Sequence, residues 1–241
     1  MFFKKKRKVN DIGRIIINAE DKRGNESYNR LRDNILYLNA DWNNKFIQVE
    51  SAMSGEGKTT TICNLAVSLG LTNKKVVVVD LDFKRPKVHR LFNLSKEIGI
   101  AEYILNDEKL EKIVKKTEYK NVEVITRGAE IYNSSLVLIS DKFKAFIKEL
   151  REKYDYVLLD CAPVLLVSDY IHISKVSDGV LFAVAYSQTS KAHVAEAIKE
   201  LEKNDAKIFG SVFTMYDKKK AGYYQLGKYN YYSYSYTDDE K

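Results

Sequence analysis

Two hydrophobic periodicities alternate along most of the chain. Continuous or every-second-residue apolar runs predict strands, and apolar residues three or four apart predict amphipathic helices. Runs of the first kind lie at residues 45–51, 74–82, 122–126, 156–160, 178–185 and 207–214. Stretches of the second kind lie at residues 26–41, 58–72, 99–105, 110–114, 134–139, 140–154 and 189–203. Because strands and helices alternate with short links, we predict an α/β fold with a mostly parallel central sheet and helices on both faces.

The two ends of the chain lack this pattern. We predict a basic, loosely ordered segment at residues 1–25, one domain at residues 26–216 and a flexible tail at residues 217–241. No apolar run approaches the roughly 18–20 residues of a membrane-spanning helix, and no signal-peptide pattern follows Met1. Cys63 and Cys161 fit no metal-ligand spacing, which indicates a reduced, intracellular setting.

The net charge of +7 allows an anionic partner without identifying it. The densest basic cluster is Lys4-Lys5-Lys6-Arg7-Lys8. Such a cluster is compatible with nuclear import, with nucleic-acid binding and with contact to an anionic membrane surface. It is equally compatible with a solvated tail that has no specific role.

A glycine-rich turn joins the strand at residues 45–51 to the helix that follows it. Ala52, four further residues and Gly57-Lys58-Thr59 fit the phosphate-loop pattern, with alanine in place of the usual first glycine. The glycines let backbone N–H groups turn toward phosphates, and the helix start adds its positive end. We expect Lys58 to contact the β- and γ-phosphates and the Thr59 hydroxyl to bind Mg²⁺. The expected nucleotide contacts are Ser54, Gly55, Glu56, Gly57, Lys58, Thr59 and Thr60. This loop predicts the P-loop NTPase fold.

Carboxylates stand at the ends of two further apolar strands. Asp80 and Asp82 follow four consecutive valines, and Asp160 follows a second apolar run that has the form of a Walker B strand. Open α/β sheets bind their ligands at this edge. The only two prolines of the chain, Pro86 and Pro163, lie just beyond these carboxylates.

The last segment is rich in tyrosine and poor in aliphatic residues, so it cannot form a core. Its seven tyrosines are Tyr223, Tyr224, Tyr229, Tyr231, Tyr232, Tyr234 and Tyr236. They are compatible with a low-complexity tail, with stacking on single-stranded nucleic acid, or with phosphate acceptance. The neighbouring phosphate loop and carboxylates favour the third interpretation.

Residues 52–59, 80–86 and 160–163 and the tyrosine cluster together resemble the bacterial tyrosine kinases (BY-kinases). More narrowly, the chain is similar to the separate cytoplasmic kinase subunit of capsule and exopolysaccharide systems. The resemblance implies an ATP- and Mg²⁺-dependent enzyme that phosphorylates its own tail tyrosines in trans and regulates polysaccharide synthesis and export. It gives Asp80 the role of base for the tyrosine hydroxyl, and it gives Asp82 and Asp160 roles at the metal.

The resemblance also implies partners and a location. They are a membrane activator protein of the polysaccharide co-polymerase type, acting through its cytoplasmic tail, and a cognate tyrosine phosphatase. The kinase would lie in the cytoplasm at the inner face of the membrane, held there by its partner. The family assembles into rings through a Glu-x-x-Arg-x-x-Arg helix, which corresponds here to Glu26, Asn29 with its neighbour Arg30, and Arg32.

Two further positions depart from the family pattern. Lys84 replaces an arginine, and Thr214 replaces an asparagine that reads the base in related folds.

Two alternatives remain. A partition- or division-type ATPase switch (ParA/MinD-like) shares the sheet and three motifs, but it carries a second loop lysine where this chain has Met53, and it lacks a tyrosine tail. A nucleic-acid-binding module would leave the strand-end carboxylates unexplained, because they repel phosphate backbones. We therefore expect no nucleic-acid partner.

Overall fold

The computed structural model describes residues 14–17, 22–38 and 44–216. Within them, a single seven-stranded sheet has the order β3-β4-β2-β5-β1-β6-β7. All neighbouring strands run parallel except β3 and β4, which are antiparallel. The strands are β1 (Phe46–Ser51), β2 (Val76–Asp80), β3 (Val114–Lys116), β4 (Val122–Ile125), β5 (Tyr156–Asp160), β6 (Gly179–Ala185) and β7 (Ile208–Thr214).

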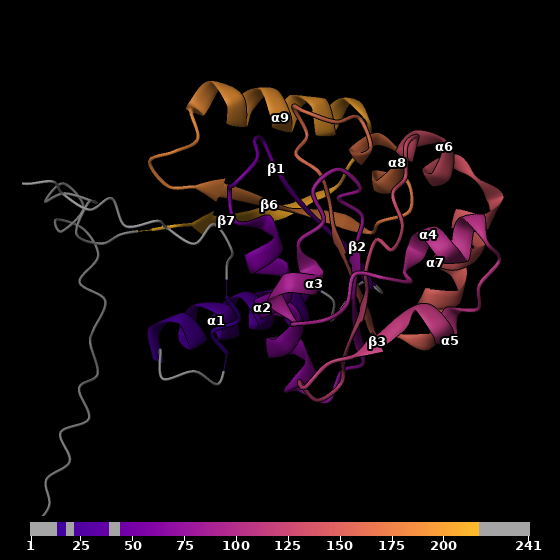
Figure 1. Ribbon diagram of the computed structural model, residues 1–241. Coiled ribbons are helices and arrows are strands. Elements are labelled where there is room, and N and C mark those ends of the chain that lie inside the picture. The colour runs from indigo at the N-terminus through magenta and orange to yellow at the C-terminus, as the bar shows by residue number, and fades with distance from the viewer. Residues whose placement is uncertain (1–13, 18–21, 39–43, 217–241) are drawn as a thin grey trace, which may run out of the picture.

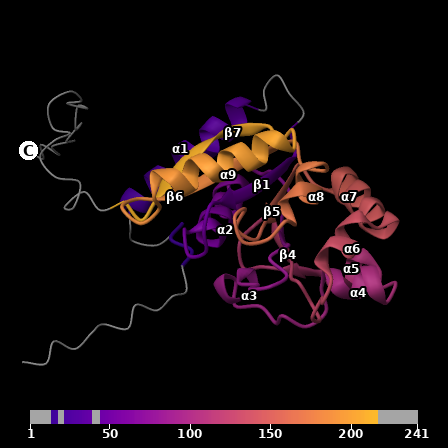
Figure 2. The same cartoon turned by 90° about the horizontal axis from the view of Figure 1, so that it is seen from above.

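Helices cover both faces of the sheet (Figure 1). They are α1 (Lys22–Leu38), α2 (Lys58–Gly70), α3 (Val88–Leu91), α4 (Ile100–Leu105), α5 (Leu110–Ile113), α6 (Ser134–Ile139), α7 (Asp141–Lys153), α8 (Tyr170–Ser174) and α9 (Lys191–Lys203). One face packs against α1, α2 and α3. The other packs against α4 to α8, and α9 covers β6 and β7 on that same side (Figure 2). This confirms the predicted P-loop NTPase-like α/β architecture.

The central strands are buried on both faces, which is why their residues are largely β-branched. Val76 and Val78 face the α2 side, whereas Val77 and Val79 face the α7 side. Asp80 of β2 and Asp160 of β5 are paired in register at the carboxyl end of the sheet. The register therefore places the two carboxylates side by side.

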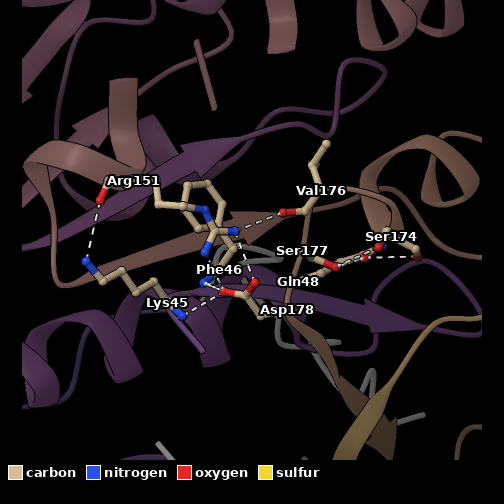
Figure 3. A network of polar contacts seen from close by, with 8 residues as sticks. All are labelled: Lys45, Phe46, Gln48, Arg151, Ser174, Val176, Ser177 and Asp178. Atoms are coloured by element: carbon tan, nitrogen blue, oxygen red, sulfur yellow. Dashed lines mark hydrogen bonds and ion pairs between the residues drawn. The ribbon is translucent and has the colours of Figure 1, made fainter. Parts of the chain in front are cut away.

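A polar clamp fixes the amino end of β1 (Figure 3). Oδ2 of Asp178 accepts hydrogen bonds from the backbone N–H groups of Lys45 and Phe46, at 2.7 and 2.8 Å. The Arg151 guanidinium, near the end of α7, binds both oxygens of Asp178 at 3.0 and 3.2 Å and lies over the Phe46 ring. One carboxylate thus joins β1, β6 and α7.

The structure differs from the sequence prediction in three elements. Helix α1 begins at Lys22 rather than residue 26, and β3 and α8 were not predicted. Residues 14–17 pack on α2: Ile17 is buried, and the backbone N–H of Ile16 donates to Oδ1 of Asn64 at 2.7 Å. Part of the segment predicted to be loosely ordered therefore contacts the domain.

The Ser140 hydroxyl caps the start of α7, since it accepts from the Phe143 N–H at 3.1 Å. Among residues 14–17, 22–38 and 44–216, no helix combines the length and apolar character needed to span a bilayer.

Candidate active site

The glycine-rich turn has the backbone conformation that its glycines allow. Gly55 and Gly57 have φ values of +83° and +86°, in the left-handed region that other residues avoid. The N–H of Thr61 donates to the carbonyl of Gly57 at 2.9 Å, so helix α2 starts directly from the turn. A helix start beside a loop of this shape suits phosphate binding.

Side chains inside the protein brace this loop. The buried Glu56 carboxylate accepts from the Met53 N–H at 2.9 Å and from the Thr189 hydroxyl. The Thr214 hydroxyl, at the end of β7, donates to the carbonyl of Glu56 at 2.7 Å. The Glu56 side chain is thus engaged within the protein, which leaves its backbone for a nucleotide. Thr214 shapes the loop from the neighbouring strand.

Lys58 is folded against the loop. Its ammonium group donates to the Ser51 hydroxyl at 3.0 Å, and that hydroxyl donates to the Met53 carbonyl at 2.8 Å. The side chain is only 6% exposed. A positive charge is therefore held at the point where phosphate-loop enzymes neutralise phosphate oxygens.

The Asp80 and Asp160 carboxylates are buried side by side, and each has one oxygen in use and one without a partner. Oδ2 of Asp160 accepts from the Thr59 hydroxyl at 2.8 Å, and Oδ2 of Asp80 accepts from the backbone N–H groups of Lys87 and Val88. The Oδ1 atoms of both are buried without a hydrogen bond. An orphaned pair of this kind is costly unless another group completes it.

Burial raises the pKa of both carboxyl groups. The charge of Asp160 raises the pKa of Asp80 further, whereas Lys58 and the Thr59 hydrogen bond hold the pKa of Asp160 down. Asp82 is half-buried just beyond β2 and accepts from the Arg85 N–H at 2.9 Å. Its charge also raises the pKa of the other two, which places all three acids in one electrostatic cluster.

The residues present fit a magnesium nucleotide. Two unpartnered carboxylate oxygens and a threonine hydroxyl are hard oxygen ligands of the type that Mg²⁺ takes. In the described part of the chain, no group of three or more His, Cys, Asp or Glu side chains is arranged to hold a metal alone. Mg²⁺ usually binds one or two carboxylates together with phosphate oxygens and water.

A buried acid behind the loop was not predicted from the sequence. Glu50 lies in β1 with 0% exposure, and its Oε1 accepts from Nε2 of Gln48 at 2.6 Å. Oε1 of Gln48 accepts from the hydroxyls of Ser174 and Ser177, both at 3.1 Å (Figure 3). Burial raises the pKa of Glu50 to about 8. An acid in a strand buried on both faces is the signal that could have revealed it.

The residues predicted for assembly lie on α1, away from the loop. Glu26 and Arg30 form an exposed ion pair at 3.7 Å, with both side chains 70% exposed. Arg32 instead donates to Asn29 at 3.1 Å and to the Ser68 hydroxyl of α2 at 3.5 Å. Arg32 is therefore held within the subunit. The seven tail tyrosines lie outside the described residues.

The sheet, the loop and the paired carboxylates define a phosphate-loop NTPase of the open α/β type. The family model described as "AAA domain" matches residues 44–209. The tyrosine-protein kinase YwqD of Bacillus subtilis is 32% identical over 214 residues, which cover 89% of this chain and 87% of YwqD.

Solved structures share the fold of this chain. The chimerical protein CapA2B2 superposes with a TM-score of 0.81 at 28% identity, over 86% of this chain and 94% of that one. The septum site-determining protein MinD of Pyrococcus horikoshii, complexed with Mg-ADP, has a TM-score of 0.60 at 25% identity, over 70% of this chain and 69% of that one. The chain belongs to the bacterial tyrosine-kinase family, as its motifs indicated.

Proposed function

We propose that this protein-tyrosine kinase transfers the γ-phosphate of ATP to tyrosines of its own C-terminal segment, in trans between subunits. This reaction would regulate capsular or extracellular polysaccharide synthesis and export. The proposal rests on one observation: Lys58, Thr59 and Asp160 lie together at the edge of the sheet where β2 ends with Asp80.

Positioning and charge neutralisation account for most of phosphoryl-transfer catalysis. The loop N–H groups and Lys58 would hold the phosphates and offset negative charge on the γ-phosphate. When bound beside Thr59 and Asp160, with Asp82 close by, Mg²⁺ would supply further neutralisation. Lys58 must leave the Ser51 hydroxyl to reach a phosphate, so the 3.0 Å contact describes a resting position.

A tyrosine hydroxyl has an ordinary pKa of about 10 and must lose its proton as it attacks. Asp80 is our proposed acceptor, because burial raises its pKa and makes its carboxylate a stronger base. The side chain of Asp80 has 0% exposure beneath the 82–87 turn, whose Lys87 N–H binds it. We therefore expect this turn to move when a tyrosine enters.

The proposal includes assembly and partners. The exposed pair Glu26–Arg30 on α1 is available for a neighbouring subunit, while Arg32 stabilises the helix that presents it. A membrane activator of the polysaccharide co-polymerase type would bind through its cytoplasmic tail and keep the kinase at the inner membrane face. A cognate phosphatase would reset the tyrosines. Co-expression with such a tail should raise phosphotyrosine in the chain.

The test is incubation of the purified chain with ATP and Mg²⁺, followed by mass spectrometry of the 217–241 segment. Lys58→Met, Asp80→Asn and Asp82→Asn should each abolish its phosphorylation while circular dichroism stays unchanged. Asp141→Asn, at an exposed carboxylate on α7, is the matched control and should retain it. Free phosphate without phosphotyrosine would instead identify an ATPase switch, and intact phosphotyrosine in all three variants would reject the site.

A further inference from the structure

A group of basic side chains lies beside the catalytic edge and has no role in the nucleotide site. We call it the cationic patch, and it consists of His89, Arg90, Lys96, Lys115 and Arg127. The residues come from α3, the loop after it, β3 and the end of β4. Figure 2 shows α3 and β4 on the same side of the molecule.

The register of the sheet places this patch next to the carboxylates. Val79 pairs with Ile125, so the chain leaves β4 beside the turn that carries Asp82. The Arg127 guanidinium donates to the Phe83 carbonyl at 3.0 Å, which fixes one cation one residue away from Asp82. The patch therefore begins at the edge of the proposed active site.

The remaining members surround His89. After burial, the charges of Arg90, Lys96, Arg127 and Lys115 each lower the pKa of His89, and its Nδ1 is buried without a hydrogen-bond partner. Lys115 is held in place by the Thr126 hydroxyl at 2.6 Å and by the Ile98 carbonyl. Lys115 and Arg127 are thus held in place, and the Thr126 hydroxyl also donates to the Lys96 carbonyl at 3.4 Å, which keeps Lys96 beside them.

Acidic side chains do not neutralise this patch within the described part of the chain. None of Arg90, Lys96, Lys115 and Arg127 has a carboxylate within 4.0 Å there. Glu102, whose charge acts on Lys115, is already bound by the N–H groups of Gly99 and Ala129 at 2.6 and 3.0 Å. Uncompensated charge at this density favours an anionic partner.

The sequence itself contains a matching anion. Asp238-Asp239-Glu240 is the only run of three consecutive acidic residues in the chain, and it lies outside the described residues. It follows Tyr236 by two positions, which is about 7 Å of extended chain. An acidic run bound at the patch would bring Tyr234 and Tyr236 within a few residues of Asp82.

We propose that the cationic patch docks the acidic end Asp238-Asp239-Glu240 of a second copy of this chain and so delivers the last tyrosines to the catalytic edge. The inference rests on the proposed function, because it names how the substrate of that site is recognised. It assigns Arg90 and Lys96, both exposed, to peptide binding and not to the chemistry.

The test is a binding measurement that needs no catalysis. A labelled peptide of residues 230–241 is titrated by fluorescence anisotropy against the full chain. That chain carries Asp238→Asn, Asp239→Asn and Glu240→Gln, so that its own tail does not compete. Adding Arg90→Glu and Lys96→Glu should weaken binding by about fivefold to tenfold, and a Lys-Lys-Lys peptide end should restore it.

A matched control has the same change of charge at the opposite edge of the sheet. Lys75 and Lys120, both exposed, line a basic groove there with Lys116 and Lys153. Lys75→Glu with Lys120→Glu should leave peptide binding within about twofold, because at 0.15 M salt the screening length is about 8 Å.

Four results would overturn the docking proposal. The first three are no binding, equal loss in both variants, and no rescue by the charge-reversed peptide. The fourth is weaker peptide binding by the unmodified chain, by a factor that does not change with protein concentration, because its own tail would then occupy its own patch. Phosphotyrosine formation is assayed separately, so failure of the kinase reaction would not be confused with failure of docking.

Discussion

The Thr59 hydroxyl donates a 2.8 Å hydrogen bond to Oδ2 of Asp160, which joins the start of α2 to the end of β5. Thr59→Val keeps the shape of the side chain and removes this donor. We expect phosphoryl transfer to fall at least about 100-fold, because both a carboxylate contact and the proposed metal ligand are lost. Rates of phosphotyrosine formation measure this. Thr72→Val, at the far end of α2, is the control, and a similar loss there would contradict the assignment.

Buried Glu50 predicts a pH-dependent stability. Burial raises its folded pKa from 4.5 to about 8, so the folded state favours the neutral acid. As pH rises from about 4.5 to 8, the Glu50 carboxyl ionises in the unfolded chain but stays neutral in the folded one, so the wild type loses stability. In Glu50→Gln the amide oxygen still accepts from Gln48 and does not titrate, so the wild type loses stability relative to this variant. Urea unfolding of both chains at pH 5.5 and pH 8 checks this. A constant difference between the chains would show that Glu50 does not titrate in this range.

The two loop glycines should differ in their tolerance of alanine. Both have positive φ, which costs roughly 1–2 kcal/mol for any other residue. A Cβ on Gly57 would also lie 3.1 Å from the Thr214 side chain, whereas a Cβ on Gly55 would meet nothing within 4 Å. Gly57→Ala should therefore lower the free energy of unfolding and nucleotide affinity more than Gly55→Ala. Equal effects in denaturation and nucleotide titration would show that Thr214 does not restrict the loop.

The Asp178 clamp should act on stability alone. Asp178→Asn removes the charge that Arg151 binds and weakens acceptance from two backbone N–H groups (Figure 3). We expect a loss of about 1–3 kcal/mol in the free energy of unfolding. The catalytic rate should remain unchanged below the unfolding transition, because the clamp is at the opposite end of β1 from the loop. Asp141→Asn, in an exposed pair with Lys144, should cost much less stability than Asp178→Asn.

The strand–loop–helix unit and the strand-end acids could be predicted from the sequence because their signals are local. Four consecutive valines indicate a strand buried on both faces, and a phosphate-loop pattern directly before an amphipathic run indicates a helix start. That Asp80 and Asp160 neighbour each other follows from parallel strands ending at one edge. The tyrosine-kinase family could likewise be recognised from the sequence, because the residues that indicate it stand together in short motifs.

Other features depend on contacts between distant residues. Strand β3 has three residues, two of them lysines, so it has no usable periodicity and forms because β4 pairs with it. In β1 the apolar Ile47 and Val49 alternate with Gln48 and Glu50, which is the pattern of a strand with one exposed face. Gln48 is buried nevertheless, because its partners come from residues 174 and 177. The braced state of Glu56 depends on Thr189 and Thr214 in the same way.

The most direct measurement mixes two chains. Lys58→Met chains, distinguished by isotope labelling, are incubated with unlabelled wild-type chains, ATP and Mg²⁺, and the C-terminal segment of each is examined by mass spectrometry. We predict phosphate on tyrosines of the labelled Lys58→Met chain, which cannot phosphorylate itself. Phosphate released only to solution, or phosphotyrosine confined to the wild-type chain, would contradict transfer between subunits at the Lys58–Asp160 site.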